Sequence, residues 1–482
     1  MEKELDQVRI RKEKVQRLRE MGIDPFPYIF FRTHFSEEVK ENFDSLEEKE
    51  VVVAGRLVSR RLHGKAGFVH IEDDRGRIQI YFKYDTLQDR YALVKLLDLG
   101  DFIGVKGKVF RTKTGEVTVW AENVELLSKA LHPPPEKYHG LKDIELRYRN
   151  RHLDLMANPE VRDRFRMRTR IIQGIREFFV KEGFLEVETP VLQPRYGGAF
   201  ARPFITHYNA LDRDYFLRIA NEIYLKRLII GGFEKVFEMG KMFRNEGLDR
   251  FHNPEFTNLE AYQAYADYNV MMELVENLFL YLSKDVLKKD SFTFQGMEIV
   301  IKEKWERITY FGALEKYTGI DFYPLDMEET KRKAEELGVD TEGKVTKGKI
   351  LDAIFDKCVQ PDLVQPVFVI DYPVDITPLA KKKRGDDNLV ERFEPFMAMT
   401  EIGNAYSELN NPEEQKERFL FQQSLREKGD MEATPIDEDF IQAMMYGMPP
   451  TGGLGLGVDR VVMLLLDVPS IRDAILFPQL RE

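Results

Sequence analysis

Short runs in which apolar and polar residues alternate dominate the chain between residues 51 and 121. They cover residues 51–58, 67–72, 77–82, 101–111 and 116–121, with a helical break at 87–99. Turn sequences such as Asp74-Arg75-Gly76 separate the runs, as is typical of successive β-strands. Five short strands of this kind predict an OB-type β-barrel.

Helical periodicity precedes the predicted barrel, and a proline-rich stretch follows it. Residues 2–20 carry apolar side chains on one stripe and basic side chains over much of the rest, which predicts an N-terminal helix. Residues 131–141 predict a stiff connection. We therefore expect an N-terminal domain at residues 1–145 and a second domain at residues 146–482.

The second domain mixes helical and extended patterns, so the predicted fold class of the whole chain is α+β. Residues 146–158 and 161–182 have the period of helices. Two more predicted helices, 327–337 and 347–359, form a small insertion near residues 325–360. Their charged outer faces give no indication of a functional site.

Two extended runs, 236–243 and 255–265, flank a turn rich in Gly and Asn and predict a long hairpin. Its tip carries Arg244, Glu246 and His252, which we expect to be buried. Burying charged side chains is costly, and a polyanionic ligand with its metal ions would offset that cost. On spacing alone, a surface hairpin with solvated charges is the alternative.

Composition restricts the class of protein. The single cysteine, Cys358, excludes an internal disulfide framework. Residues 1–5 are too charged for a secretory signal, and no apolar run approaches the roughly 18 residues of a membrane span. We therefore expect a cytoplasmic protein with no membrane partner. The net charge of −11 argues against bulk electrostatic capture of nucleic acid, so any such contact must be local.

Three ordered motifs in the second domain resemble those of class II aminoacyl-tRNA synthetases. Motif 1 is similar to residues 184–190, motif 2 to residues 243–246 with Phe256 and Glu260, and motif 3 to residues 453–460. Residues 198–206 and 401–410 are similar to segments of the lysyl-tRNA synthetases. The resemblance implies a catalytic domain in which helices surround an antiparallel sheet.

The resemblance also implies an activity and an assembly. The expected reaction is ATP-dependent activation of L-lysine to lysyl-adenylate, followed by transfer of the lysyl group to the 3′ end of tRNA(Lys). A homodimer is expected through motif 1 and the helix before it, with Pro190 fixing the turn of the strand. Such phosphoryl transfer depends on positioning and charge neutralisation more than on acid–base groups.

The motif residues imply an ATP site. By resemblance, Arg244 holds the α-phosphate and the substrate carboxylate, because its planar guanidinium suits bidentate binding of oxyanions. Glu246 would contact the adenine amine, and His252 the terminal phosphates. Phe256 would stack on the adenine, and Arg460 would close over the other side of the nucleotide.

Glu394 and Glu401 imply a Mg²⁺ site beside the ATP phosphates, because this ion takes one or two protein carboxylates. The apolar residues between these two acids predict that both are buried. The family commonly has Gly-Gly-Arg or similar before the second acid, where this chain has Ala398-Met399-Thr400. That change replaces small residues and a cation beside the metal site, so it bears on catalytic efficiency.

A lysine substrate requires a narrow apolar sleeve that ends in a carboxylate, because a buried ammonium group without a counter-charge is prohibitively costly. By resemblance, the pocket comprises Glu222, Glu260, Tyr262, Asn404, Tyr406 and Glu408. We expect Glu408 to pair with the substrate ammonium group. Tyr406 stands where the family commonly has Phe.

In the barrel, residues 64–68 resemble part of the anticodon-binding domain of lysyl-tRNA synthetases. OB-type barrels bind unstacked bases on aromatic side chains and the backbone on nearby cations. We expect Phe68 to stack on a base, Gln79 to contact a base edge and Arg61 to supply the cation.

Three other readings are open. An asparaginyl- or aspartyl-tRNA synthetase would share the barrel, the motifs and the dimer, but the acids Glu222 and Glu408 argue against it. A synthetase-like paralogue that lysylates a protein typically lacks the N-terminal barrel, which looks intact here. A non-catalytic tRNA-binding protein would tolerate loss of Arg244, Glu401 or Arg460, and all three are present.

Overall fold

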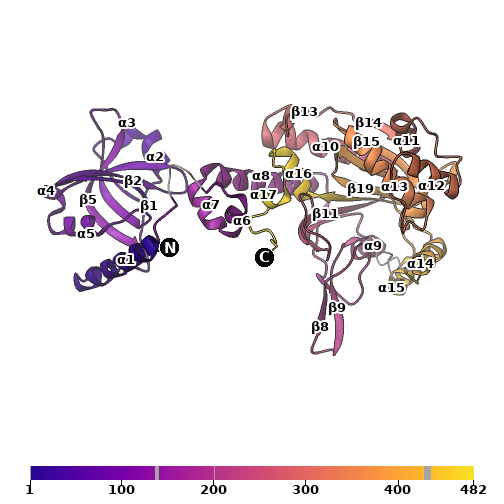
Figure 1. The fold of residues 1–482 in the computed structure, drawn as a ribbon, viewed down its shortest axis with the longest axis horizontal. Coiled ribbons are helices and arrows are strands. Elements are labelled where there is room, and N and C mark those ends of the chain that lie inside the picture. The colour runs from indigo at the N-terminus through magenta and orange to yellow at the C-terminus, as the bar shows by residue number, and fades with distance from the viewer. Residues whose placement is uncertain (1, 136–140, 200, 428–435, 482) are drawn as a thin grey trace. The chain divides into compact units, whose positions relative to one another are not determined.

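The computed structural model describes residues 2–135, 141–199, 201–427 and 436–481 (Figure 1). Residues 136–140 of the predicted connection, and Phe200 of one segment that resembles the family, lie outside the described residues. The chain forms two compact units. Unit 1 comprises Met1–Arg147 and His152–Asn158, and unit 2 comprises Tyr148–Arg151 and Pro159–Glu482.

Unit 1 is built on a closed barrel with the strand order β1-β2-β3-β5-β4, which confirms the predicted OB-type fold. The strands are β1 (Glu50–His63), β2 (Ala66–Glu72), β3 (Arg77–Lys83), β4 (Phe102–Arg111) and β5 (Val117–Ser128). Val51, Val53 and Leu57 of β1 are buried, as the two-residue period of a strand requires. Helix α5 (Tyr91–Leu96) lies within the predicted helical break, and α4 (Tyr84–Leu87) ends at its first residue.

The predicted N-terminal helix is present as α1 (Glu2–Glu20). Leu18 is buried in the barrel core. Arg11 is buried as well, and its Nη1 donates to the carbonyl oxygens of Leu99 and Ala130 at 3.1 and 2.9 Å. The short helices α2 (Ser36–Glu41) and α3 (Phe43–Leu46) complete the unit.

Unit 2 is organised around a large sheet with the order β14-β15-β17-β19-β20-β11-β10-β6. Its strands are β6 (Leu185–Glu186), β10 (Lys235–Phe243), β11 (Glu255–Ala264), β14 (Glu306–Thr309), β15 (Val367–Pro373), β17 (Asp386–Met397), β19 (Gly403–Ser407) and β20 (Thr451–Gly457). The short strands β16 (Lys382–Lys383) and β18 (Thr400–Glu401) also pair with β17. The central pairs are antiparallel, as predicted, whereas β14 with β15 and β6 with β10 are parallel.

Helices surround this sheet, as Figure 1 shows. The helices α8 (Pro159–Lys181), α10 (Tyr268–Tyr281) and α16 (Val458–Leu465) belong to one core with the central strands. That core buries Phe179, Val275 and Val462, one from each helix. A second core joins α9 (Glu222–Ile230), α14 (Pro412–Glu427) and α15 (Glu438–Met444). Among the described residues, no helix is long and apolar enough to cross a membrane.

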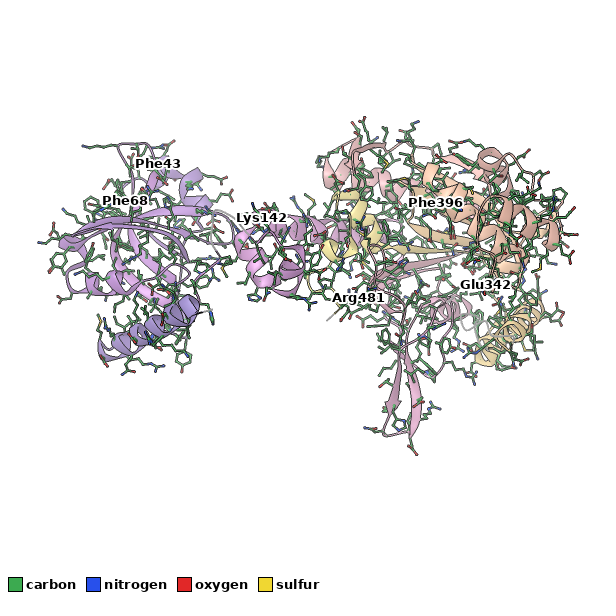
Figure 2. The ribbon with its side chains drawn as sticks, in the orientation of Figure 1. Phe43, Phe68, Lys142, Glu342, Phe396 and Arg481 are labelled. Atoms are coloured by element: carbon green, nitrogen blue, oxygen red, sulfur yellow. The ribbon has the colours of Figure 1, made fainter. Side chains whose placement is uncertain are left out.

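The insertion contains α12 (Met327–Glu336) and α13 (Lys347–Cys358), as its helical period predicts. Helix α13 packs on α11 (Tyr310–Thr318), where the rings of Tyr310 and Phe355 stack with centroids 5.2 Å apart. The ring of Phe396, labelled in Figure 2, lies 5.6 Å from that of Phe355. The insertion is therefore anchored to the sheet at β17.

The remaining elements are short strands and helices. A three-stranded sheet with the order β7-β9-β8 includes the hairpin that projects downward in Figure 1. These elements are β7 (Leu192–Gln193), β8 (Ile205–Tyr208), β9 (Arg213–Leu217), β12 (Ser291–Phe294), β13 (Met297–Val300), α6 (Ile144–Arg149), α7 (Arg151–Ala157) and α17 (Ile471–Ala474).

Candidate active site

A strip of glycines on β20 forms the floor of the site. Gly453, Gly455 and Gly457 share one face of the strand, because alternate residues point the same way. Their cross-strand partners are Tyr262, Glu260 and Asn258 on β11, and Tyr406 and Asn404 on β19. A Cβ atom at Gly453 would lie 1.9 Å from Oε1 of Glu408, so only glycine lets that carboxylate lie against the strand.

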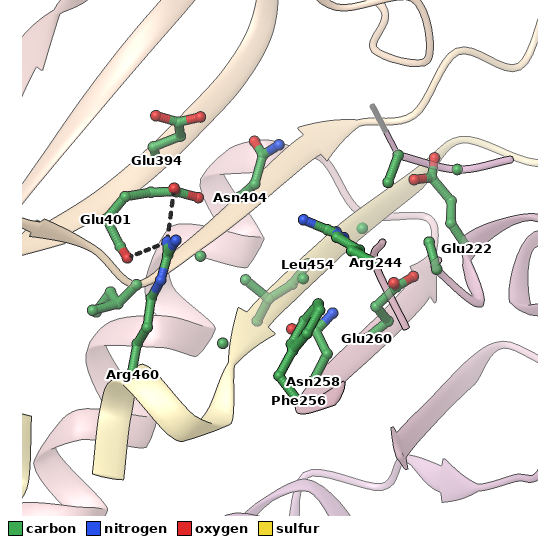
Figure 3. A pocket seen from close by; sticks show the side chains of 18 of the residues that line it. Glu222, Arg244, Phe256, Asn258, Glu260, Glu394, Glu401, Asn404, Leu454 and Arg460 are labelled. Carbon is green, nitrogen blue, oxygen red and sulfur yellow. Dashed lines mark hydrogen bonds and ion pairs between the residues drawn. The ribbon is translucent and has the colours of Figure 1, made fainter. Parts of the chain in front are cut away.

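Above this floor is a cavity of about 410 Å³, a volume typical of small-molecule sites (Figure 3). Every residue predicted to bind ATP, lysine or metal lines it: Glu222, Arg244, Glu246, His252, Phe256, Glu260, Tyr262, Glu394, Glu401, Asn404, Tyr406, Glu408 and Arg460. Helices α9 and α16, the β10–β11 hairpin, and strands β17, β18 and β19 contribute these residues. The fold thus brings the residues together without assigning a role to any one of them.

Arg244 follows β10 directly and lies beside an aromatic ring. Its Cζ is 5.1 Å from the centroid of Phe256, and its backbone N–H donates to the carbonyl oxygen of Pro254 at 2.9 Å. Burial lowers the pKa of Arg244 from its ordinary value. A desolvated guanidinium of this kind binds an entering oxyanion strongly.

Glu246 and His252 lie on the loop beyond Arg244 and are exposed, which corrects the expectation of a buried hairpin tip. The β10–β11 ladder ends at the pair Phe243 and Glu255, so the loop projects past the sheet into solvent. His252 Nδ1 lies 2.7 Å from a carboxylate oxygen of Asp249. Only Arg244 among the three predicted charges is desolvated.

The two predicted metal acids differ in exposure. The Glu394 side chain is 14% exposed, whereas that of Glu401 is 36% exposed, so the prediction of burial was wrong for Glu401. Glu394 pairs with Arg392 and accepts a hydrogen bond from the Tyr372 hydroxyl at 2.8 Å. Burial raises the pKa of Glu394, and Glu401 adds to this rise while Arg392 opposes it. Glu401 accepts a hydrogen bond from Arg460 at 2.9 Å (Figure 3).

Three buried carboxylates, Glu222, Glu260 and Glu408, gather at the other end of the cavity. The Tyr262 hydroxyl donates to Glu260 Oε2 at 3.2 Å. Burial, reinforced by Glu222, raises the pKa of Glu260 to about 8. Burial likewise raises the pKa of Glu408. An entering cation would stabilise the ionised form of these acids and would itself gain counter-charges.

The hydroxyl that distinguishes Tyr406 from phenylalanine has a partner within the protein. Asn404 Nδ2 donates to this hydroxyl at 2.6 Å, and Asn404 Oδ1 accepts from Arg392 Nε at 3.0 Å. The extra oxygen therefore takes part in a series of hydrogen bonds that runs from Tyr406 through Asn404 to Arg392.

Sequence reasoning missed three charged residues around the cavity. Arg392 lines it from β17, and Asp352 lines it from α13 of the insertion, where no functional site was expected. The Tyr310 hydroxyl donates to Asp352 at 3.0 Å, and burial raises the pKa of Asp352 to about 6. The third residue, Lys226, follows Glu222 by one helical turn on α9. The four-residue spacing of Glu222 and Lys226 is a signal that could have found it.

In unit 1, the predicted anticodon residues lie on neighbouring strands. Arg61 of β1 is the cross-strand partner of Phe68 on β2, which in turn faces Tyr81 on β3. The rings of Phe68 and Tyr81 have centroids 4.8 Å apart, and that of Trp120 lies 5.4 Å from Tyr81. Phe68 is 38% exposed (Figure 2). Tyr81 and Trp120 extend this aromatic surface and were not predicted.

Gln79 lies beside this surface but is largely buried. Its Nε2 donates to Glu116 Oε2 at 2.7 Å, and its Oε1 accepts from the Thr118 hydroxyl at 2.8 Å. The two contacts hold the amide in one orientation and leave one N–H for a ligand. Contact with a base edge stays a prediction.

The two units match two known families. Residues 143–481 match the class II tRNA synthetases (D, K and N), and residues 51–127 match the OB-fold nucleic acid binding domain. The lysine–tRNA ligase of Carboxydothermus hydrogenoformans is 53% identical over 476 residues, which are 98% of each chain. Those of Thermoanaerobacter pseudethanolicus and Clostridium novyi are 53% and 54% identical over 98% of this chain and 96% and 94% of their own. The chain belongs to the lysine–tRNA ligase family.

This family member carries a strained turn before Glu401. Ala398 and Met399 have φ angles of 51° and 61°, in the left-handed region that favours glycine. They are the central residues of a two-residue hairpin, since Met397 pairs with Thr400. Their backbone N–H groups donate to the carbonyl oxygens of residues 364 and 363 at 2.8 and 2.9 Å, which holds the turn in place.

The donor set of this ligase-family site fits Mg²⁺ bound together with ATP. In the described part of the chain, no group of three or more His, Cys, Asp and Glu side chains could hold a metal ion alone. Glu394 and Glu401 lie at the same end of the cavity (Figure 3). Mg²⁺ commonly takes one or two carboxylates and completes its coordination with water and substrate phosphates.

Proposed function

We propose that this chain activates L-lysine with ATP and transfers the lysyl group to the 3′ end of tRNA(Lys). The observation that carries the proposal is the cluster of three buried carboxylates, Glu222, Glu260 and Glu408, in the same cavity as Arg244. Such a cluster favours an amino acid with a second ammonium group and repels an acidic side chain. The printed names of the near-full-length relatives support the same activity.

In the first step, a carboxylate oxygen of lysine attacks the α-phosphorus of ATP, and the bond to pyrophosphate breaks. Arg244 binds the substrate carboxylate and the α-phosphate, so it brings the reacting groups together and neutralises their charge. Phe256 stacks on the adenine, and Glu246 accepts from its amine. His252 contacts the terminal phosphates, and Arg460 closes over the other side of the nucleotide. In the second step, a ribose hydroxyl of the tRNA attacks the lysyl carbonyl carbon and AMP leaves.

In the amino-acid pocket, Glu408 pairs with the side-chain ammonium group of lysine. Glu222, Glu260 and the hydroxyl of Tyr262 complete the polar end of the pocket. Asn404 contacts the substrate through its side-chain amide, and Tyr406 forms a wall of the pocket. The burial of all three acids supports these assignments.

Glu394 and Glu401 would hold Mg²⁺ together with the ATP phosphates. When bound, the ion would neutralise negative charge on the phosphates. Arg460 orients the Glu401 carboxylate through the hydrogen bond that joins them.

We also infer how the rest of the chain serves this activity. Residues 1–145 would bind the tRNA anticodon through Arg61, Phe68 and Gln79, and residues 146–482 would catalyse both steps. A homodimer would cover the exposed apolar side chains of Leu185, Val191, Leu192 and Ile205 around motif 1. The expected location is the cytoplasm, where tRNA and ATP are used together.

Pyrophosphate exchange with each of the twenty amino acids tests the proposal. We expect lysine to be far ahead. Arginine has a wider planar head group, and uncharged isosteres leave buried carboxylates unpaired. Dominant exchange with asparagine or aspartate would assign the chain to those synthetases. Absence of exchange with any amino acid would favour a non-catalytic tRNA-binding protein.

Glu408→Gln separates the amino-acid pocket from the ATP site. Breaking the ion pair should cost lysine activation about 3–5 kcal/mol, while ATP binding is retained. Glu417→Gln, an exposed acid on α14, is the matched control and should leave exchange unchanged. Equal losses of lysine and ATP affinity would contradict the assignment of Glu408.

A further inference from the structure

Lys226 is fully buried directly behind the acidic end of the cavity. It lies on α9, and its Nζ is 2.5 Å from Glu222 Oε1 and pairs also with Glu408 Oε2. The rings of Tyr262 and Phe440 each have centroids 6.0 Å from this Nζ. Lys226 does not appear among the described residues that line the cavity. Its ammonium group therefore contacts the acids from within the protein and not from the cavity.

Both partners of Lys226 are acids that face the cavity, so the ion pairs fix the position of their carboxylates. Glu222 belongs to α9 and Glu408 directly follows β19, so Lys226 joins α9 to the end of that strand. Glu408 has no hydrogen bond of good geometry from any other described group, so the ammonium group is its main stabilising contact.

The charges of the acids and of Lys226 can be compared with those of the substrate. A bound cation favours the ionised form of Glu222, Glu260 and Glu408, and Lys226 supplies one ammonium group against these three carboxylates. With all three acids ionised, two negative charges are left for the substrate to neutralise. Free lysine carries two ammonium groups, whereas neutral and acidic amino acids carry one. Arg244 lines the same cavity, where it can bind the substrate carboxylate.

We propose that Lys226 is a positioning residue that sets the charge of the amino-acid pocket to match the two ammonium groups of its substrate. This inference rests on the proposed lysine activation. Without Lys226, the pocket would hold one more negative charge than the substrate can neutralise. One acid would then take up a proton, and it would no longer attract the substrate.

The pKa values of the cluster agree with this role. Burial alone would lower the pKa of Lys226, but Glu222 and Glu408 outweigh burial and raise it, so the ammonium group stays charged. In return, Lys226 opposes the rise that burial and the neighbouring acids impose on the pKa of Glu408. Groups that face Glu408 are Lys226 and Glu222 from α9, Glu260 and Tyr262 from β11, and Tyr406 from β19.

Lys226→Met tests the proposal by lysine-dependent pyrophosphate exchange from pH 6 to pH 9. We expect the KM for lysine to rise about tenfold or more, while the KM for ATP stays within about twofold. The acidic limb of the pH profile of kcat/KM for lysine should move to higher pH, because Glu408 loses the cation that lowers its pKa. A purely structural role would not move this limb. Arg227→Met is the matched control, because Arg227 is the next residue on α9 and lies 3.8 Å from Asp437 instead.

A second variant covers the case in which Lys226→Met does not fold. The double variant Lys226→Met, Glu222→Gln removes one cation and one anion, so the pocket keeps its net charge and no acid loses its partner alone. Its acidic limb should lie closer to that of the unaltered protein than to that of Lys226→Met. An unshifted limb in Lys226→Met, or an equally shifted limb in the double variant, would overturn the role of Lys226. If the unaltered protein showed no lysine-dependent exchange, the proposed function itself would fail.

Discussion

Nη1 of Arg460 donates to both the backbone carbonyl oxygen and the carboxylate Oε2 of Glu401, each at 2.9 Å. The two contacts join the start of α16 to the short strand β18. The carboxylate therefore has its orientation defined by a residue of motif 3, although the two residues are 59 positions apart in the chain.

Glu401→Gln should strongly reduce lysine activation, and added Mg²⁺ should restore part of it. The amide keeps the shape of the side chain but removes the charge that attracts the ion. Pyrophosphate exchange over a series of Mg²⁺ concentrations measures the effect, with Glu417→Gln as the control. Full activity of the variant at low Mg²⁺ would remove Glu401 from the metal site.

Phe68→Ala should weaken tRNA charging but leave adenylate formation nearly intact. Loss of one stacked base costs binding about 1–3 kcal/mol. Phe68 is an exposed ring of the aromatic surface that also includes Tyr81. Charging assays and pyrophosphate exchange on the same preparation separate the two steps. Tyr28→Ala is the control, because Tyr28 is a fully exposed ring of unit 1 outside this surface. A parallel fall in adenylate formation would contradict an anticodon role.

Lysine binding should become tighter as the pH rises toward 8. Below that pH, Glu260 is mostly protonated, because burial and Glu222 raise its pKa to about 8. A bound ammonium group favours the ionised acid, so binding releases a proton, and affinity rises until Glu260 is already ionised. The substrate side chain keeps its own proton until about pH 10. Groups that face Glu260 include Glu222, Arg244, Tyr262, Glu408 and the N–H of Asn221.

Calorimetric titration with lysine in two buffers of different ionisation heat counts the released protons. Glu260→Gln should flatten the pH dependence between pH 6 and 8. Constant affinity across this range, with no proton release, would show that Glu260 does not face the bound lysine.

Ala398→Gly should cost less stability than a glycine substitution within a helix. The left-handed conformation costs a residue with a side chain about 1–2 kcal/mol, whereas the added chain entropy of glycine costs about 0.5–1 kcal/mol. Ala398 is also buried in the core, and loss of its methyl group costs about 0.8 kcal/mol. The three contributions nearly cancel, so the free energy of unfolding should change by less than about 1 kcal/mol. Denaturant unfolding measures the change, and Ala353→Gly within α13, where no strain is relieved, should lose about 1 kcal/mol or more. An equal loss in the two variants would show that the turn is unstrained.

Local patterns in the sequence predicted much of this protein. Alternation and turn residues predicted the barrel strands, and the two extended runs of the hairpin predicted β10 and β11. These features depend on neighbours within a few residues, and their periods can be read directly from the chain. The resemblance to the synthetase motifs and to further segments of the family supplied the predicted residues that line the cavity.

Only the tertiary structure decided what depends on distant partners. The exposure of Glu246 and His252 follows from where the hairpin ladder ends, and the place of Asp352 follows from the packing of α13 on the sheet. The role of Lys226 depends on the fold, because only the packing of α9 against the end of β19 lets Lys226 pair with both Glu222 and Glu408. Burial and charge pairing are sums over residues far apart in sequence, so no local pattern contains them.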